Sequence, residues 1–489
     1  MLGWIGFALA AVSVTAFAAG TNSSGSPSGD VLLLDNLGRV VAVPTNEVPS
    51  ALRPTTGAGL ERQIPSPTAG ASVSPEVLRR IHAGTNGFQF FPAAPPPVMP
   101  YLASVDEYGN TAIHPGALFY FNWLEGPVQD AKYWLSEYGF RYSLQQTFTF
   151  VSMTEVTKGD NNLGYHTTDF KSKLALFDAP DAGTAGWISS EVQAKNSFES
   201  AGKTQSAKSN LGTVTDPTGI WSDVNGLRVP ELAWQQSAHD GEIMVVAGMV
   251  SQRNYIDANA YAGSGRGKFI NSGLIHSQVL PLAQYNFGLN LQWQPADEWY
   301  TMAGGSMGNA SGGEIPWTDF SGKVWSLPGE IGYAPRDLFG LGPGVYRIQP
   351  FAAGVNDATG GGLCFDLQQQ LSSQSPFGWF GRSGFGSSEV SAGASAQVGT
   401  GFVMQGPLKH LLSHMTSYDF LGVGFVRGQP AFTTKKVYHE NEYVLEAVYA
   451  QQLTLFVKLQ PDVQAVWNPA FNRNVGPALV FQVQLVVTW

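Results

Sequence analysis

The last eleven residues of the chain, which decide the fold, read Leu479-Val480-Phe481-Gln482-Val483-Gln484-Leu485-Val486-Val487-Thr488-Trp489. Every second residue is apolar, up to the terminal position: Leu479, Phe481, Val483, Leu485, Val487 and Trp489. Such a repeat of two is typical of a β-strand, because successive side chains of a strand point to opposite faces. The stretch therefore predicts a strand with one unbroken apolar face, either in a membrane barrel or at the buried edge of a soluble sheet.

The same alternation recurs along the chain. Its apolar columns are Phe140, Tyr142, Leu144, Phe148 and Phe150; Tyr285, Phe287, Leu289, Leu291 and Trp293; Tyr443, Leu445, Ala447 and Tyr449; and Leu453, Leu455, Val457 and Leu459. The residues between them are mostly amides and hydroxyls, whereas a soluble sheet usually exposes Lys and Glu. An uncharged hydrogen-bonding face suits a water-filled lumen that binds neutral polyols.

The composition favours a membrane barrel over the other fold classes. Only 13% of the 489 residues are charged and 43% are hydrophobic, with a mean hydropathy of −0.05, whereas soluble domains carry about 25% charge. A helical membrane protein needs spans of about 20 apolar residues, and polar residues interrupt every such stretch beyond residue 19. The sequence therefore predicts an all-β protein, a transmembrane antiparallel barrel. Cys364 is the single cysteine, which excludes an intramolecular disulfide.

The number of strands follows from length. Strands of ~9–11 residues with their turns and loops use ~22–24 residues each, which predicts about 16 strands in a barrel domain over residues 126–489. An even number places both barrel ends in the periplasm, and a barrel of this size is wide enough for an aqueous channel. A short helix over residues 128–138, with Tyr138 on its apolar side and Lys132 off it, precedes the first strand and ends at Gly139.

The N-terminal part differs from the rest. Residues 1–18 read as a signal peptide that ends in Ala16-Phe17-Ala18, although no Lys or Arg precedes Arg39, so a misassigned start or an uncleaved anchor stays open. Residues 19–125 are rich in Ser, Pro and Gly and read as a periplasmic arm, with a small hairpin over residues 31–43 and a short helix from Ser74. The arm is either a spacer or a segment that docks on the cell wall or a partner.

Four groups of motifs resemble the carbohydrate-selective porin family (OprB-like). They are Glu446-Ala447-Val448-Tyr449 with Gln460-Pro461-Asp462-Val463-Gln464 and Asn468-Pro469; residues 361–371 with Phe377-Gly378-Trp379-Phe380-Gly381-Arg382; Asp419-Phe420-Leu421-Gly422-Val423-Gly424; and Gly248, Asp257, Asn259 and Phe269-Ile270-Asn271. The resemblance covers about residues 120–489. It implies a 16-stranded porin of the bacterial outer membrane that passes mono- and oligosaccharides by diffusion. The arm is longer than expected of the family, and residues 304–344 are predicted to form an extracellular or inward-folded loop.

Sugar recognition in a pore needs hydrogen-bonding groups and a few charges that fix orientation. Strand parity and the motifs give these pore-lining candidates: Arg141, Lys171, Glu231, Arg253, Asp257, Glu446 and Lys458. Each is either a sugar contact or a solvated lumen charge without a specific role. Glu446 is the strongest candidate, as a sugar ligand or as a structural carboxylate. Trp489 is predicted to be the signal for membrane assembly.

Other functional classes find no support in the sequence. There is no metal-binding or nucleophile motif, so no enzyme, metal or cofactor is predicted. The net charge of −10 argues against nucleic acid. The predicted partners are carbohydrate solutes, outer-membrane lipid, the assembly machinery and a second copy of the chain. The alternative function is a structural barrel that anchors the envelope to a cell-wall or surface-layer partner through the arm.

Overall fold

The computed structural model describes residues 30–34, 40–44, 128, 131–132, 134–135, 138–179, 182–198, 206–219, 226–263, 266–308, 322–372, 375–408, 419–431, 435–454, 456–473 and 477–489. They belong to two units. In the first unit, β1 (Asp30–Leu34) pairs antiparallel with β2 (Val40–Pro44), in the hairpin that the sequence predicts. The predicted signal peptide and the helix from Ser74 lie outside the described residues.

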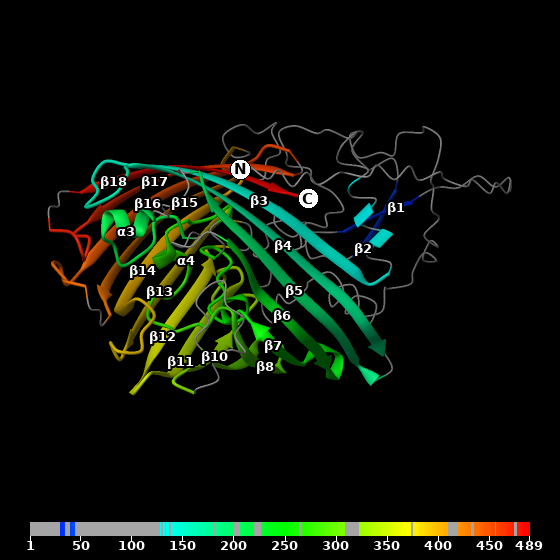
Figure 1. Cartoon of the computed structure of the whole chain (residues 1–489). Coiled ribbons are helices and arrows are strands. Elements are labelled where there is room, and N and C mark those ends of the chain that lie inside the picture. Colours follow the sequence, from blue (N-terminus) through cyan, green and yellow to red (C-terminus); the bar gives the residue numbers. More distant parts are fainter. Residues whose placement is uncertain are drawn as a thin grey trace, which may run out of the picture. The chain divides into compact units, whose positions relative to one another are not determined.

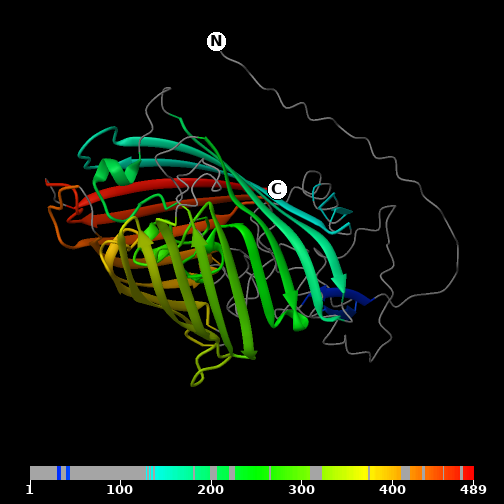
Figure 2. The ribbon, with the colours of Figure 1, turned by 60° about the horizontal axis from the view of Figure 1, so that its bottom comes forward.

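The second unit is a closed antiparallel barrel of sixteen strands, which confirms the predicted fold (Figures 1 and 2). The strands are β3 (Phe140–Met153), β4 (Asn162–Ala179), β5 (Thr184–Ser197), β6 (Gly226–Ala238), β7 (Ile243–Val250), β8 (Asn286–Ala296), β9 (Trp299–Met307), β10 (Val324–Tyr333), β11 (Gly344–Val355), β12 (Ala358–Gln370), β13 (Phe377–Gly386), β14 (Ala394–Gln405), β15 (Asp419–Pro430), β16 (Glu442–Gln452), β17 (Val457–Trp467) and β18 (Ala478–Thr488). Each strand pairs with the next, and β18 pairs with β3, Gln484 lying opposite Thr149. Closure leaves the sheet without an edge. A sheet that spans a membrane must be closed in this way, because lipid cannot bind the backbone groups of a free edge.

The two faces of the barrel differ as the alternation predicts. On β18, Leu479, Phe481 and Val483 are exposed on the outer face, whereas Gln482 and Gln484 are buried inside. An apolar outer face fits contact with lipid, and a polar inner face fits water or a polar filling. Among the described residues, no helix is long and apolar enough to cross a membrane.

Residues 304–344 are not a loop, which corrects the sequence prediction. They contain the end of β9 and all of β10, and only residues 309–321 of this stretch lie outside the described residues. Glycine serves cross-strand packing here: a Cβ on Gly332 would collide with the ring of Tyr300, which lies opposite on β9. The many glycines therefore mark close contacts within the sheet, and glycine content alone gave a false loop signal.

Two smaller expectations also need correction. Strand β17 begins at Val457, so Leu453 belongs to the turn before it, where the Thr454 hydroxyl accepts the Val457 N–H at 3.1 Å. The helix before β3 is present at residues 128, 131–132 and 134–135, but Lys132 is 2% exposed and Tyr138 is 69% exposed. The Nζ of Lys132 lies 5.3 Å from the ring centroid of Tyr142, because an aromatic face attracts a cation.

Two connections fold into the barrel. The first insert, residues 206–219 between β5 and β6, contains α3 (Ala207–Leu211). The second insert, residues 251–285 between β7 and β8, contains η4 (Gln252–Asn254) and α4 (Ser272–Ile275). Both follow odd-numbered strands, and strand direction alternates, so both start from the rim opposite the one where β18 ends.

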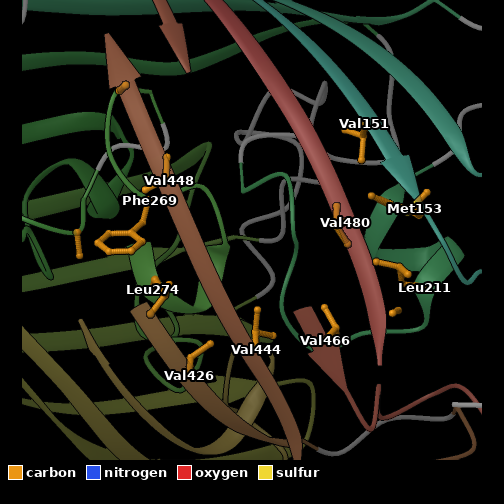
Figure 3. Packing of buried hydrophobic residues seen from close by; sticks show 14 of the residues in the cluster. Val151, Met153, Leu211, Phe269, Leu274, Val426, Val444, Val448, Val466 and Val480 are labelled. Atoms are coloured by element: carbon orange, nitrogen blue, oxygen red, sulfur yellow. The ribbon is translucent and has the colours of Figure 1, made fainter. Parts of the chain in front are cut away.

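The inserts pack against the inner wall through a shared apolar cluster. Leu211 of the first insert and Phe269 and Leu274 of the second belong to one buried group (Figure 3). Its wall members include Val426, Val444, Val448, Val466 and Val480, which come from β15 to β18. These valines occupy inward positions where a purely aqueous lumen would favour polar side chains, so they mark where the inserts lie.

Candidate pore-lining site

Two carboxylates on β16 hold the inserts by their backbone. Glu446 accepts the Ile270 N–H at 2.6 Å and the Asn271 N–H at 2.9 Å, one on each oxygen. Glu442, four residues earlier on the same face, accepts the N–H groups of Val214 at 2.7 Å and Thr215 at 3.0 Å. Both glutamates are at most 1% exposed. Both carboxyl oxygens of Glu446 are thus occupied by the backbone of the second insert, and a contact of Glu446 with sugar stays a prediction.

Wall glutamines make the same kind of contact. Gln368 accepts the Ala260 N–H at 2.7 Å, and Gln397 accepts the Gln278 N–H at 2.6 Å. The side-chain amide of Gln464 donates to the Pro217 carbonyl at 2.8 Å. Much of the amide-rich inner face therefore binds the backbone of the inserts. The sequence indicated this face correctly, but it did not predict that backbone groups of the chain itself occupy it.

A ladder of alternating charges crosses four neighbouring strands. Its members are Glu330 on β10, Arg347 on β11, Asp366 on β12 and Arg382 on β13, and it ends on Asp257 of the second insert. Arg347 lies 3.4 Å from Glu330 and forms an ion pair with Asp366. Arg382 lies 3.1 Å from Asp366 and 2.6 Å from Asp257. All five side chains are at most 4% exposed, and charges buried this deeply are tolerated only because each has a partner.

Asp257 locks the second insert to this ladder. Its own N–H donates to Glu330 at 3.0 Å, and its carboxylate accepts the Ser277 N–H at 2.7 Å. Its φ of 68° is in the left-handed region, where Asp is more frequent than most residues. Burial alone would raise the pKa of Asp257, but Arg382 and His276 bring that pKa down to about 2. The carboxylate is thus charged and fully engaged in protein contacts.

On the wall formed by β4 to β6, polar side chains keep some contact with solvent. Lys171 on β4 lies 3.8 Å from Glu191 on β5, and their side chains are 35% and 13% exposed. Asn254 of the second insert donates to Glu191 at 3.4 Å and to Glu231 on β6 at 3.2 Å. The Ser189 hydroxyl donates to Glu231 at 2.6 Å. Lys171 and Glu231 are thus joined into one network, in which Asn254 is exposed and the Lys171 side chain is 35% exposed.

Two arginines of the second insert reach other groups. Arg266 donates to Gln145 of β3 at 2.5 Å and forms an ion pair with Asp169 of β4. Arg253 faces Gln284, whose amide oxygen, in the orientation that satisfies both groups, accepts from Nε at 2.8 Å and from Nη1 at 2.7 Å. The second insert thus contacts β3 and β4 as well as β10 to β17.

The remaining candidates lie toward the rim where the chain ends. Arg141 occupies an inward position of β3, opposite Lys173 of β4, and Lys458 occupies an inward position at the start of β17. Trp489 completes the pairing of β18 with β3, since its N–H donates to the Leu144 carbonyl at 2.8 Å. Its ring lies 5.2 Å from that of Phe456.

The sequence missed several charges that build the interior: Glu330, Arg347, Asp366, Arg382, Glu442 and Arg266. Glu442 could have been predicted, because it lies four residues before Glu446 on the same strand and therefore faces the same side. Asp366 and Arg382 lie in glycine-rich stretches where alternation is hard to read. Arg266 carried no signal, because its importance depends on an insert whose path the sequence does not show.

Comparisons with known proteins agree with this architecture. Residues 182–353 and 349–489 match the family described as "Carbohydrate-selective porin, OprB family". The high-pH structure of Pseudomonas putida OprB superposes with a TM-score of 0.61 at 14% identity, over 75% of this chain and 97% of that one. A mutant of Rh. blastica porin gives a TM-score of 0.45 at 9% identity, over 72% of this chain and 100% of that one. A search of the curated proteins found no match.

The first of these structures supports the barrel fold. The family match carries more weight, because it covers more than half of the chain, including every strand from β6 to β18. It also contains the second insert, the charge ladder and both β16 anchors. On this evidence, the chain belongs to the carbohydrate-selective porin (OprB) family.

Proposed function

We propose that the chain is a porin of the bacterial outer membrane through which mono- and oligosaccharides diffuse passively. The observation that carries the proposal is a closed barrel with an apolar outer face, whose interior keeps partly exposed polar side chains such as Lys171, Glu191 and Asn254. Such groups can exchange hydrogen bonds with sugar hydroxyls while binding stays weak enough for release. Transport, rather than catalysis, is the function that this arrangement supports.

Purified protein in planar bilayers should open channels, and liposomes that contain it should swell in isotonic glucose or maltose. Swelling should be slower for maltose, because the two inserts narrow the lumen. Protein-free liposomes, and liposomes with heat-denatured protein, are the controls. Failure to conduct and to swell with folded protein would show that the barrel is closed to sugars.

We further propose that residues 19–125 lie in the periplasm. β3 begins and β18 ends at the same rim, because Gln145 near the start of β3 lies opposite Thr488. An even strand number then keeps the arm and the terminal Trp489 on one side of the membrane. The role of Trp489 in assembly, the signal peptide and a self-associated form stay predictions.

Protease added to intact cells should leave residues 19–125 uncut, whereas the same protease should remove them after the outer membrane is permeabilised. A tag placed in the arm reports the cleavage, and a tag placed in the 154–161 connection, on the opposite rim, serves as the accessible control. Cleavage of the arm in intact cells would overturn this topology.

A further inference from the structure

Inside the barrel, acidic and basic side chains differ in their exposure to solvent. On the inward strand faces and the two inserts, most described acids are buried, at 6% exposure or less: Asp169, Glu231, Asp257, Glu330, Asp366, Asp419, Glu442, Glu446 and Asp462. Within the same described parts, only Glu191 and Asp216 keep partial exposure. The acids thus hold the interior together and offer little charge to a passing solute.

The basic side chains are distributed differently. Lys173, Lys195, Arg228, Arg347 and Arg382 are buried. A second set keeps partial exposure: Arg141, Lys171, Lys208, Arg253, Arg266, Lys268 and Lys458. The water-accessible charge of the described interior is therefore positive, although the whole chain has a net charge of −10. Accessible charges dominate the effect on ions, because low-dielectric walls focus their field into the lumen.

Lys268 and Lys458 form the focus of this surface. Gln460 on β17 accepts the Gly267 N–H, and its amide donates to the Lys268 carbonyl at 2.5 Å, which fixes the second insert beside β17. Gly267 has a φ of 102°, and a Cβ there would collide with the Lys458 ammonium. None of the ion pairs between described side chains includes either lysine.

The Lys458 ammonium lies beside Gly267, the residue that precedes Lys268, and its charge acts on the protonation of Lys268. Burial, and then the charge of Lys458, lower the pKa of Lys268 to about 8. An anion that enters between the two lysines would relieve their repulsion, whereas a neutral sugar would not.

We infer that the pore prefers anionic solutes and takes sugar acids, whose carboxylate pairs with Lys268 and Lys458 while their hydroxyls meet the polar wall. This inference rests on the proposed function, because it presumes an open lumen. It names a narrower class of solute than neutral carbohydrates, and it follows from which charges contact water.

The test is the reversal potential of the intact protein in planar bilayers under a tenfold salt gradient. With KCl, and with potassium glucuronate, the sign should indicate anion preference of about fivefold, since ~1 kcal/mol of attraction between charges in water corresponds to that factor. With glucosamine hydrochloride, chloride should carry nearly all the current. A preference for potassium over glucuronate would overturn the inference while leaving a porin in place, and an absence of channels would overturn the proposed function instead.

Variants locate the effect. Lys268→Gln and Lys458→Gln should each reduce the anion preference by about half, and the double variant should nearly abolish it. Lys436→Gln is the matched control, because Lys436 is exposed in the connection between β15 and β16. Raising the pH from 7 to 9 deprotonates Lys268 and should lower the preference in the unmodified protein but much less in Lys268→Gln. An unchanged reversal potential in the double variant would show that these lysines do not set selectivity.

Discussion

Glu446→Ala should widen the pore. The substitution removes the acceptor of two buried backbone N–H groups, at Ile270 and Asn271. A buried N–H left without an acceptor costs about 1–3 kcal/mol, so the attachment of the second insert to the wall should weaken by roughly 2–6 kcal/mol. We expect single-channel conductance to rise several-fold and current noise to increase, while the barrel itself stays folded.

Glu446→Gln should have a smaller effect, because its amide oxygen can still accept one N–H while its NH₂ group opposes the other. Glu389→Ala is the matched control, since Glu389 is exposed in the turn between β13 and β14. Wild-type conductance in Glu446→Ala, with the barrel folded, would mean that the contacts of the second insert with β10 to β14 suffice to hold it.

Arg382→Met should destabilise the barrel more than any other single change in the charge ladder. It leaves Asp257 and Asp366 facing each other without the guanidinium that lies between them. Breaking a buried pair by removing one partner costs about 3–5 kcal/mol. The midpoint of urea unfolding, followed by the mobility of the folded band in cold detergent gels, should fall accordingly.

A second change tests the cause of that loss. The triple variant Arg382→Met, Asp257→Asn, Asp366→Asn no longer buries an uncompensated carboxylate at this end, so it should recover much of the lost stability. Arg427→Met is the control, because Arg427 is exposed on β15, where its guanidinium donates to Asn441. A triple variant as unstable as Arg382→Met would show that packing, rather than unpaired charge, causes the loss.

The sequence predicted the strands best where the outer face is strictly apolar. β3, β16 and β18 alternate visibly, because lipid favours apolar side chains on one face; Gln146 is an exception on β3. β10 was missed, because Pro328, Gly329 and Gly332 interrupt its pattern, although each fits a local contact with a neighbouring strand. The alternation of apolar and polar residues identifies a strand only where side chains make the contacts between strands. Where glycines let the backbones approach closely, the alternation is lost.

The positions of the candidate residues could be predicted from the sequence better than their roles. The alternation of side chains along the strands put Arg141, Lys171, Glu231 and Lys458 on the inner face. Arg253 and Asp257 were expected inside the lumen because they follow the end of a strand. Their partners could not be predicted, because Asp257 meets Arg382 125 positions away in the chain. The backbone N–H groups that Glu442 and Glu446 accept have no side-chain signature, so no sequence pattern reveals an anchor of this kind.

The two β16 anchors have a consequence for biogenesis. Glu442 and Glu446 lie 228 and 176 residues after the N–H groups that they bind, so the inserts leave the ribosome long before their acceptors exist. Pairing across such separations is slow compared with the joining of adjacent hairpins. The inserts therefore cannot bind the wall until β16 has been made. The addition of the last three strands closes the barrel and also fixes the two inserts inside it. A chain truncated before β16 loses both anchors as well as the closing strands.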